Sequence, residues 1–204
     1  IPHCPFDPML AGISLTCFTA SYLIALALEA TRVWFRSGLR GALLLGFAAA
    51  GLFAHTLFLV NRVSTTVGTP LSSEFDWYLL AAWALAAVYA VWTFGQLWTP
   101  GERRTPVGLF VLPLVLALVA AAHFVAGREP MARQDALGIW LVIHLSTLVF
   151  AFVSILVGFT FGVMDLLQAR RLKQKLPGRQ ALRLPSLEWL ERAGVRSLFT
   201  SFVA

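Results

Sequence analysis

Long apolar stretches alternate with short polar segments along most of this chain. A helix that crosses the hydrocarbon core of a bilayer needs about 20 mainly apolar residues, because each residue adds about 1.5 Å. Five stretches reach that length without a Lys or Arg: residues 9–30, 41–60, 77–98, 105–126 and 137–167. The pattern therefore predicts an all-α protein, a polytopic bundle of transmembrane helices.

Composition supports this prediction. Of the 204 residues, 58% are apolar and 13% are charged, whereas about a quarter of the residues in a soluble domain are charged. A soluble α/β domain, a disordered chain and a disulfide scaffold are therefore excluded.

The basic residues lie on alternate sides of the predicted spans. Of the 16 Lys and Arg residues, three follow the first span, two follow the third and eight follow the fifth, which leaves three for the other side. Cytoplasmic loops carry the excess of positive charge in membrane proteins. The N-terminus is therefore expected outside and residues 170–196 in the cytoplasm. The net charge of +6 is then an orientation signal and does not predict nucleic-acid binding.

Both ends of the chain suggest a fragment of a longer protein. The chain begins at Ile1 without a Met, and residues 197–204 resemble the start of a truncated sixth span. Residues 1–8 are expected to form an extracytoplasmic N-terminal stretch, and residues 9–204 one transmembrane domain that is truncated at its C-terminus. Before the sixth span, Glu188 and Arg192 have the i, i+4 spacing of an ion pair on a short helix.

Three histidines inside the apolar stretches are the candidate functional residues: His55, His123 and His144. Ionisable side chains are uncommon in membrane helices and usually face the interior of the bundle. With the orientation above, all three fall in the outer leaflet, about 5 to 11 Å from its edge. Three histidines at similar depth can converge on one site. The alternative for each is a simple interhelical hydrogen bond or, for His123, a hydrated helix end.

The surroundings of the histidines favour haem over other ligands. Neutral imidazole is an axial ligand of haem iron. Acidic residues such as Glu29 and Asp165 occur only near span ends, which argues against both a closed zinc site and a proton path through the full thickness. Nearby aromatic residues suit a flat macrocycle, although they are ordinary in any membrane bundle: Phe53, Phe58, Phe150 and Phe152. Three arginines just outside the spans either pair with haem propionates or simply flank the helices: Arg62, Arg128 and Arg133.

Several segments resemble the cytochrome c assembly proteins, a family that includes CcsA, ResC and the shorter HemX-like membrane proteins. The strongest resemblance is Trp-Leu-Val-Ile-His-Leu-Ser at residues 140–146, followed by a long span and a basic tail at residues 168–173. Residues 184–191 are similar to the segment that leads into the family's next span, and residues 72–76 to a stretch before a span in CcsA. Residues 54–55 match a histidine position of HemX-like members.

The resemblance implies haem handling in cytochrome c maturation. Proteins similar to CcsA carry haem to the outer face of the bacterial inner (cytoplasmic) membrane and present it to apocytochrome c, together with a membrane partner similar to CcsB or ResB. On this resemblance, b-type haem is bound non-covalently in transit, with His144 as an axial ligand of the iron and His55 as a second or transit ligand. His123 has no clear counterpart. The chain alone is not expected to be an enzyme, because attachment uses the haem vinyl groups and the acceptor thiols.

Two branches of the family stay open. The Trp-rich, Asp-containing outer motif that cradles haem in CcsA would follow the sixth span, and HemX-like members lack it. The alternative function is therefore a HemX-like membrane scaffold or regulator of haem metabolism that does not itself bind haem. A small transporter would need polar residues deep in several spans, and these are scarce in the sequence.

Overall fold

The computed structural model describes residues 8–31, 38–65, 73–98, 106–127 and 139–173, together with residues 188, 191–192, 194–197 and 199. Within these ranges the chain is helical and contains no strand, which confirms the predicted all-α class. The long helices are α1 (Pro8–Thr31), α2 (Gly38–Thr65), α3 (Glu74–Trp98), α4 (Gly108–Phe124) and α5 (Ile139–Lys173). Each coincides with one predicted span, and α5 continues beyond its span into the basic segment.

Three helices contain a segment that is long and apolar enough to cross a membrane: Gly41–Ser64 in α2, Glu74–Gln96 in α3 and Ser146–Lys173 in α5. The described parts of α1 and α4 contain shorter apolar helices, Leu15–Thr31 and Gly108–Phe124. The chain therefore has the build of a membrane protein, with three of the five predicted spans meeting the length and hydropathy of a crossing helix.

Polar residues determine where α3 begins. The backbone N–H of Asp76 donates to Ser73 Oγ at 3.3 Å, and the Ser73 hydroxyl donates to the Asp76 carboxylate at 2.6 Å. A serine before the helix that accepts from the backbone N–H of the third helical residue is a favourable N-cap, and the bond between the two side chains holds the serine in place. The cap explains why α3 begins at Glu74, three residues before the predicted span.

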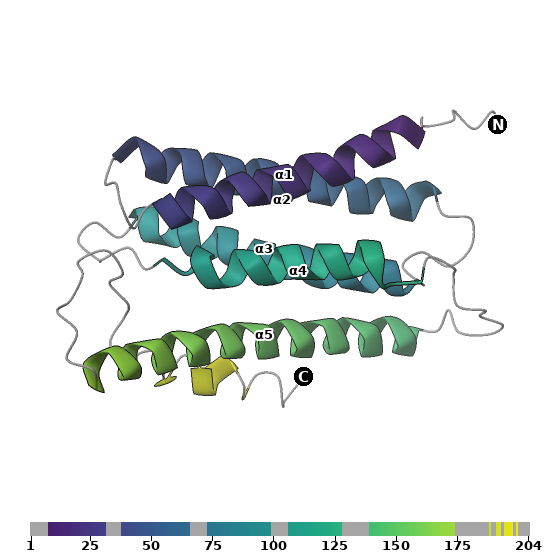
Figure 1. Cartoon of the computed structure of the whole chain (residues 1–204). Coiled ribbons are helices and arrows are strands. Elements are labelled where there is room, and N and C mark those ends of the chain that lie inside the picture. Colours follow the sequence, from purple (N-terminus) through teal and green to yellow (C-terminus); the bar gives the residue numbers. More distant parts are fainter. Residues whose placement is uncertain are drawn as a thin grey trace, which may run out of the picture.

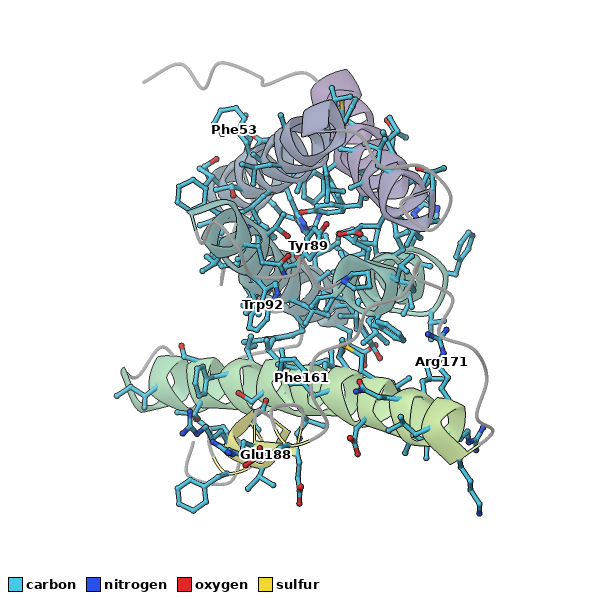
Figure 2. All side chains as sticks on the ribbon, turned by 90° about the vertical axis from the view of Figure 1, so that its left-hand side faces the viewer. Phe53, Tyr89, Trp92, Phe161, Arg171 and Glu188 are labelled. Carbon is cyan, nitrogen blue, oxygen red and sulfur yellow. The ribbon has the colours of Figure 1, made fainter. Side chains whose placement is uncertain are left out.

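Helices α1 to α4 form a closed four-helix bundle. Contacts join α1 to α2, α2 to α3, α3 to α4 and α4 back to α1. Successive helices run in opposite directions (Figure 1). Within the described ranges, α5 contacts only α3 and α4, and it passes obliquely beneath the bundle (Figure 2). The four-helix bundle thus has an enclosed interior, whereas α5 is peripheral.

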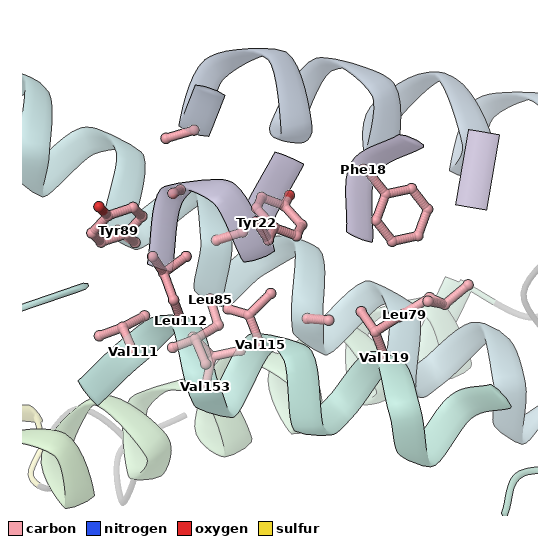
Figure 3. Packing of buried hydrophobic residues seen from close by; sticks show 14 of the residues in the cluster. Phe18, Tyr22, Leu79, Leu85, Tyr89, Val111, Leu112, Val115, Val119 and Val153 are labelled. Carbon is pink, nitrogen blue, oxygen red and sulfur yellow. The ribbon is translucent and has the colours of Figure 1, made fainter. Parts of the chain in front are cut away.

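The interior of the bundle combines large apolar side chains with small ones. Phe18 and Tyr22 from α1 pack against α2, and Leu79 and Leu85 of α3 lie below them with the valines of α4 in the view of Figure 3. Alanines of α1, α2 and α3 also belong to the core: Ala25, Ala48, Ala82 and Ala86. Membrane helices associate through such small residues, because lipid tails offer no hydrophobic driving force between helices. Large apolar side chains also cover the outside, as expected of a surface that faces lipid; Phe53, for example, is 66% exposed.

The segment after α5 returns to that helix. Glu188 and Arg192 form the predicted i, i+4 ion pair. The Ser197 hydroxyl donates to the Ser154 carbonyl of α5 at 2.6 Å. Residues 194–197 and 199 are helical, while residues 1–7 and most of the predicted sixth span lie outside the described residues.

Candidate functional site

His55 lies in the interior of the four-helix bundle, where its side chain is completely buried. Its ring stacks flat on Phe18 of α1, with ring centroids 4.2 Å apart and an interplanar angle of 2°. The Tyr22 hydroxyl lies 3.4 Å from His55 Nδ1. Gly51, one turn before His55, provides room for Tyr22, because a Cβ atom there would lie 2.8 Å from the tyrosine ring. The α1–α2 contact therefore holds the imidazole parallel to Phe18 in this structure.

The other ring nitrogen of His55 has no partner. Nε2 is buried and forms no hydrogen bond with any described residue. Leaving a buried polar atom unsatisfied costs about 1–3 kcal/mol, so such atoms are rare and require an explanation. Nε2 is therefore the atom at which the bundle interior can take up something that the protein does not itself supply.

A second buried polar pair joins α1 to α3. Glu29 is 2% exposed, and the Tyr89 hydroxyl donates to its Oε1 at 3.5 Å. Figure 2 shows Tyr89 among the four helices of the bundle. Gly108 at the start of α4 makes room for this pair, since a Cβ atom there would lie 2.8 Å from both Glu29 Cγ and the Tyr89 ring. Sequence analysis placed Glu29 only near a span end and missed this pair.

A third polar pair lies where α2 ends and α3 begins. Arg62 Nε donates to Oδ1 of Asp76, whose side chain is 3% exposed, and the guanidinium lies over the Phe75 ring at 4.8 Å from its centroid. The Phe75 N–H also donates to the Gly127 carbonyl at 3.3 Å, which places the end of α4 at the same end of the bundle. Arg62, a candidate partner of haem propionates, is thus already paired with a carboxylate. Arg128 and Arg133 lie outside the described residues.

His123 and His144 lie outside the bundle interior. His123, near the end of α4, is exposed and meets the Phe124 ring edge to face, with centroids 4.9 Å apart. His144 is exposed on α5, and its imidazole forms no hydrogen bond within the described residues, while its carbonyl accepts from Thr147. It is two positions before Ser146, which faces α3, and this spacing turns it by about 200° around the helix. His144 therefore lies on the face of α5 that is turned away from the bundle.

The three histidines lie in the same half of the molecule but do not converge. The helices alternate in direction, so the end of α2, the end of α4 and the start of α5 lie at one end. Yet α2, which carries His55, contacts neither α4 nor α5 among the described residues. Nor do the described ranges contain any group of three His, Cys, Asp or Glu side chains suited to a metal ion. A single haem held between His55 and His144 does not fit this arrangement.

The aromatic residues that sequence analysis considered for a macrocycle are also dispersed. Phe53, Phe150 and Phe152 are exposed, whereas Phe58 is buried against Phe18, with ring centroids 5.8 Å apart. Phe18 itself, which stacks on His55, was not anticipated. The sequence held one signal for it, since Phe18 and Tyr22 are four residues apart and so share one face of α1.

A cavity of about 470 Å³ lies between α3 and α5. Its walls are almost entirely apolar and contain no histidine or carboxylate: Leu80, Trp83, Ala84, Val88, Ser146, Val149, Phe150, Val153, Ser154, Val157 and Ser197. This cavity therefore offers no ligand to a metal ion.

Comparison with known proteins identifies no relative. The chain matches no protein-family model, no curated protein and no solved structure.

Proposed function

We propose that this chain is an integral membrane protein of cytochrome c maturation that holds haem in transit at the outer face of the bacterial inner membrane. One observation carries the proposal. His144 presents an exposed imidazole, without a hydrogen-bond partner among the described residues, on the free face of a long apolar helix. The segment around it, residues 140–146, is also the part of the chain that most resembles the cytochrome c assembly proteins.

The proposed topology has five crossings and an outside N-terminus. The alternating directions of α1 to α5 support it, because successive connections then lie on opposite sides of the bilayer. The distribution of Lys and Arg supports the orientation, with 13 of the 16 on the side assigned to the cytoplasm. In this topology His144 lies near the outer surface, five residues after α5 begins.

The chain's own contribution would be ligation and position. When bound, haem supplies an iron that accepts an imidazole nitrogen and vinyl groups that react with the thiols of an acceptor. His144 would hold the group on the outward face of α5, where apocytochrome c and a partner similar to CcsB or ResB can approach without disturbing the bundle. His55 is enclosed by α1 and stacked on Phe18, so it would not be the second ligand of the same iron.

The test is haem binding by the purified full chain. Wild type, His144→Ala and His123→Ala are purified in mild detergent from cells supplied with haem, and the Soret absorbance per chain is compared. His123→Ala is the matched control, because it removes another exposed histidine from the same end of the molecule. Wild type and His123→Ala are expected to carry haem, and His144→Ala to lose it. Absence of haem from wild type, or full retention by His144→Ala, would overturn the proposal.

The second candidate is a HemX-like scaffold that does not bind haem. Two observations favour it: the histidines do not converge, and the walls of the cavity between α3 and α5 carry no histidine or carboxylate. It predicts that His144→Ala is silent, whereas replacing the exposed Arg170, Arg171 and Lys173 at the end of α5 weakens co-purification of a membrane partner. His144→Ala and the substitutions at the end of α5 therefore separate the two candidate functions.

A further inference from the structure

Three polar pairs lie along the four-helix bundle; two are buried, and in the third, Arg62–Asp76, only the carboxylate is buried. On α2, His55 and Arg62 are seven residues apart, and on α1 Tyr22 and Glu29 are also seven residues apart. Seven residues make about two helical turns. His55 and Arg62 therefore share one face of α2, Tyr22 and Glu29 share one face of α1, and in both cases the two residues are about 10.5 Å apart along the helix axis. In order, the pairs are Arg62–Asp76, Tyr22–His55 and Glu29–Tyr89.

Together these pairs form a line about 21 Å long, which we call the polar line. It draws on α1, α2 and α3, while α4 contributes Gly108, over which Glu29 and Tyr89 pack. Ionisable residues inside a membrane bundle are costly, and chains of Asp, Glu and His are typical of proton relays. The polar line could not be predicted from the sequence, because Glu29 and Asp76 lie near helix ends and their burial is visible only in the folded bundle.

We propose that the polar line conducts protons through the four-helix bundle, with His55 as its central acceptor. The proposal rests on the fully buried Nε2 of His55, which forms no hydrogen bond with any described residue and so can accept a proton from outside the pairs. The proposal goes beyond haem handling and does not use His144.

The transfer at His55 balances in protons. Nε2 takes up a proton that arrives from the side of Asp76, and the Nδ1 proton passes to the Tyr22 oxygen, which lies 3.4 Å away. The hydroxyl proton of Tyr22 leaves toward Tyr89 and Glu29. One proton has entered and one has left, so neutral imidazole and a neutral phenol remain. A turn of the Tyr22 hydroxyl and a half-turn flip of the imidazole, which transiently breaks its stack on Phe18 and restores it, reset the line. Movement of a counter-ion across the membrane balances the transferred charge.

The two gaps in the polar line differ. Small buried side chains, Ala25 and Ala48, follow Tyr22 and His55 toward Glu29, and the proposal requires water to enter beside them when a proton passes. Between His55 and Arg62 lies Phe58, which is 7% exposed and packed on Phe18. Phe58 is therefore the expected barrier to proton entry, and a smaller side chain there should increase the flux.

The test is proton flux through the full chain in phosphatidylcholine–phosphatidylglycerol vesicles. A potassium gradient with valinomycin sets the potential, and an enclosed pH-sensitive dye reports the flux. Wild type is expected to exceed protein-free vesicles. His55→Gln and Tyr22→Phe should lose the excess flux, Phe58→Ala should raise it, and His123→Gln should match wild type. Tyr22→Phe preserves the aromatic packing, so its effect does not depend on how well His55→Gln folds.

Two results would overturn the proposal: wild-type flux no greater than that of protein-free vesicles, or wild-type flux in Tyr22→Phe. Haem absorbance in the same samples reports His144 separately, so failure of the proton proposal and failure of the haem proposal are distinguishable.

Discussion

Replacing Gly51 with Ala tests the contact that holds Tyr22 beside His55. A Cβ atom there would lie 2.8 Å from Tyr22 Cε1, 3.0 Å from Tyr22 Cδ1 and 3.1 Å from Ser21 Cβ. Carbon atoms pack at about 3.5–4.0 Å, so either α1 and α2 must separate or the tyrosine ring must move. Either change disturbs the α1–α2 contact around the buried imidazole.

The expected magnitude follows from two opposing effects. Overpacking in a well-packed interior costs about 1–3 kcal/mol. Replacing a helical Gly with Ala contributes about 0.5–1 kcal/mol of stability. Gly46→Ala on the same helix is the matched control, because a Cβ atom there meets nothing within 4 Å and only the second effect applies. The two variants should therefore differ by about 1–3 kcal/mol in the free energy of unfolding, with Gly51→Ala the less stable.

The assay is unfolding in mixed micelles with increasing dodecyl sulfate, followed by circular dichroism. Gly51→Ala should unfold at a lower detergent fraction than wild type, and Gly46→Ala at the same or a higher fraction. Equal stability of the two variants would contradict the close packing of Tyr22 on α2.

Two further contacts can be tested by the same unfolding measurement. Thr56→Val removes the bond that Trp83 Nε1 donates to Thr56 Oγ1 at 2.8 Å, and it should cost about 0.6 kcal/mol, the mean for interhelical bonds in membranes. Trp83→Phe should then destabilise the Thr56→Val variant less than it destabilises wild type, because the hydrogen bond is already absent and only packing is lost. Asp76→Asn removes the buried partner of Arg62 and should cost about 1–3 kcal/mol, less than a fully buried pair because Arg62 is 31% exposed. Arg62→Gln should cost less in the Asp76→Asn background than in wild type, and equal costs in both would contradict the pairing.

Helix number and position could be predicted from the apolar stretches. Backbone N–H and C=O groups in such stretches need partners within the segment, which only a helix provides in a membrane. Boundaries were less predictable, since they depend on individual side chains. The cap at Ser73 moved the start of α3, and α5 continued into basic residues through Lys173 that hydropathy had excluded.

The face that each histidine occupies could not be predicted. Helices that are apolar on every side carry little periodic signal, so the sequence does not indicate which side faces the interior. Depth in the membrane was therefore the available criterion, and it grouped His55, His123 and His144 although only His55 is buried. The helix order around the bundle separates them, because α5 packs outside the ring that α1 to α4 form.

The buried carboxylates show a related difficulty. Glu29 and Asp76 lie close to polar connecting segments, where exposure to water is the usual outcome. In the structure Glu29 is covered by Tyr89 and Gly108, and Asp76 by Arg62 and Ser73. Their burial results from contacts between helices that are distant in sequence, so position along the chain does not reveal it.

Both proposals depend on a bundle that crosses the bilayer with its Arg62–Asp76 end outside. Single cysteines at two exposed positions test this most directly, Ser64→Cys near the end of α2 and Lys173→Cys at the end of α5, after replacement of Cys4 and Cys17 by Ser. Intact cells are treated with a membrane-impermeant maleimide, and labelling is compared with that in opened cells. Cysteine at residue 64 should label in intact cells and cysteine at residue 173 only in opened cells. The reverse pattern, or labelling of both positions from the same side, would contradict the proposed topology.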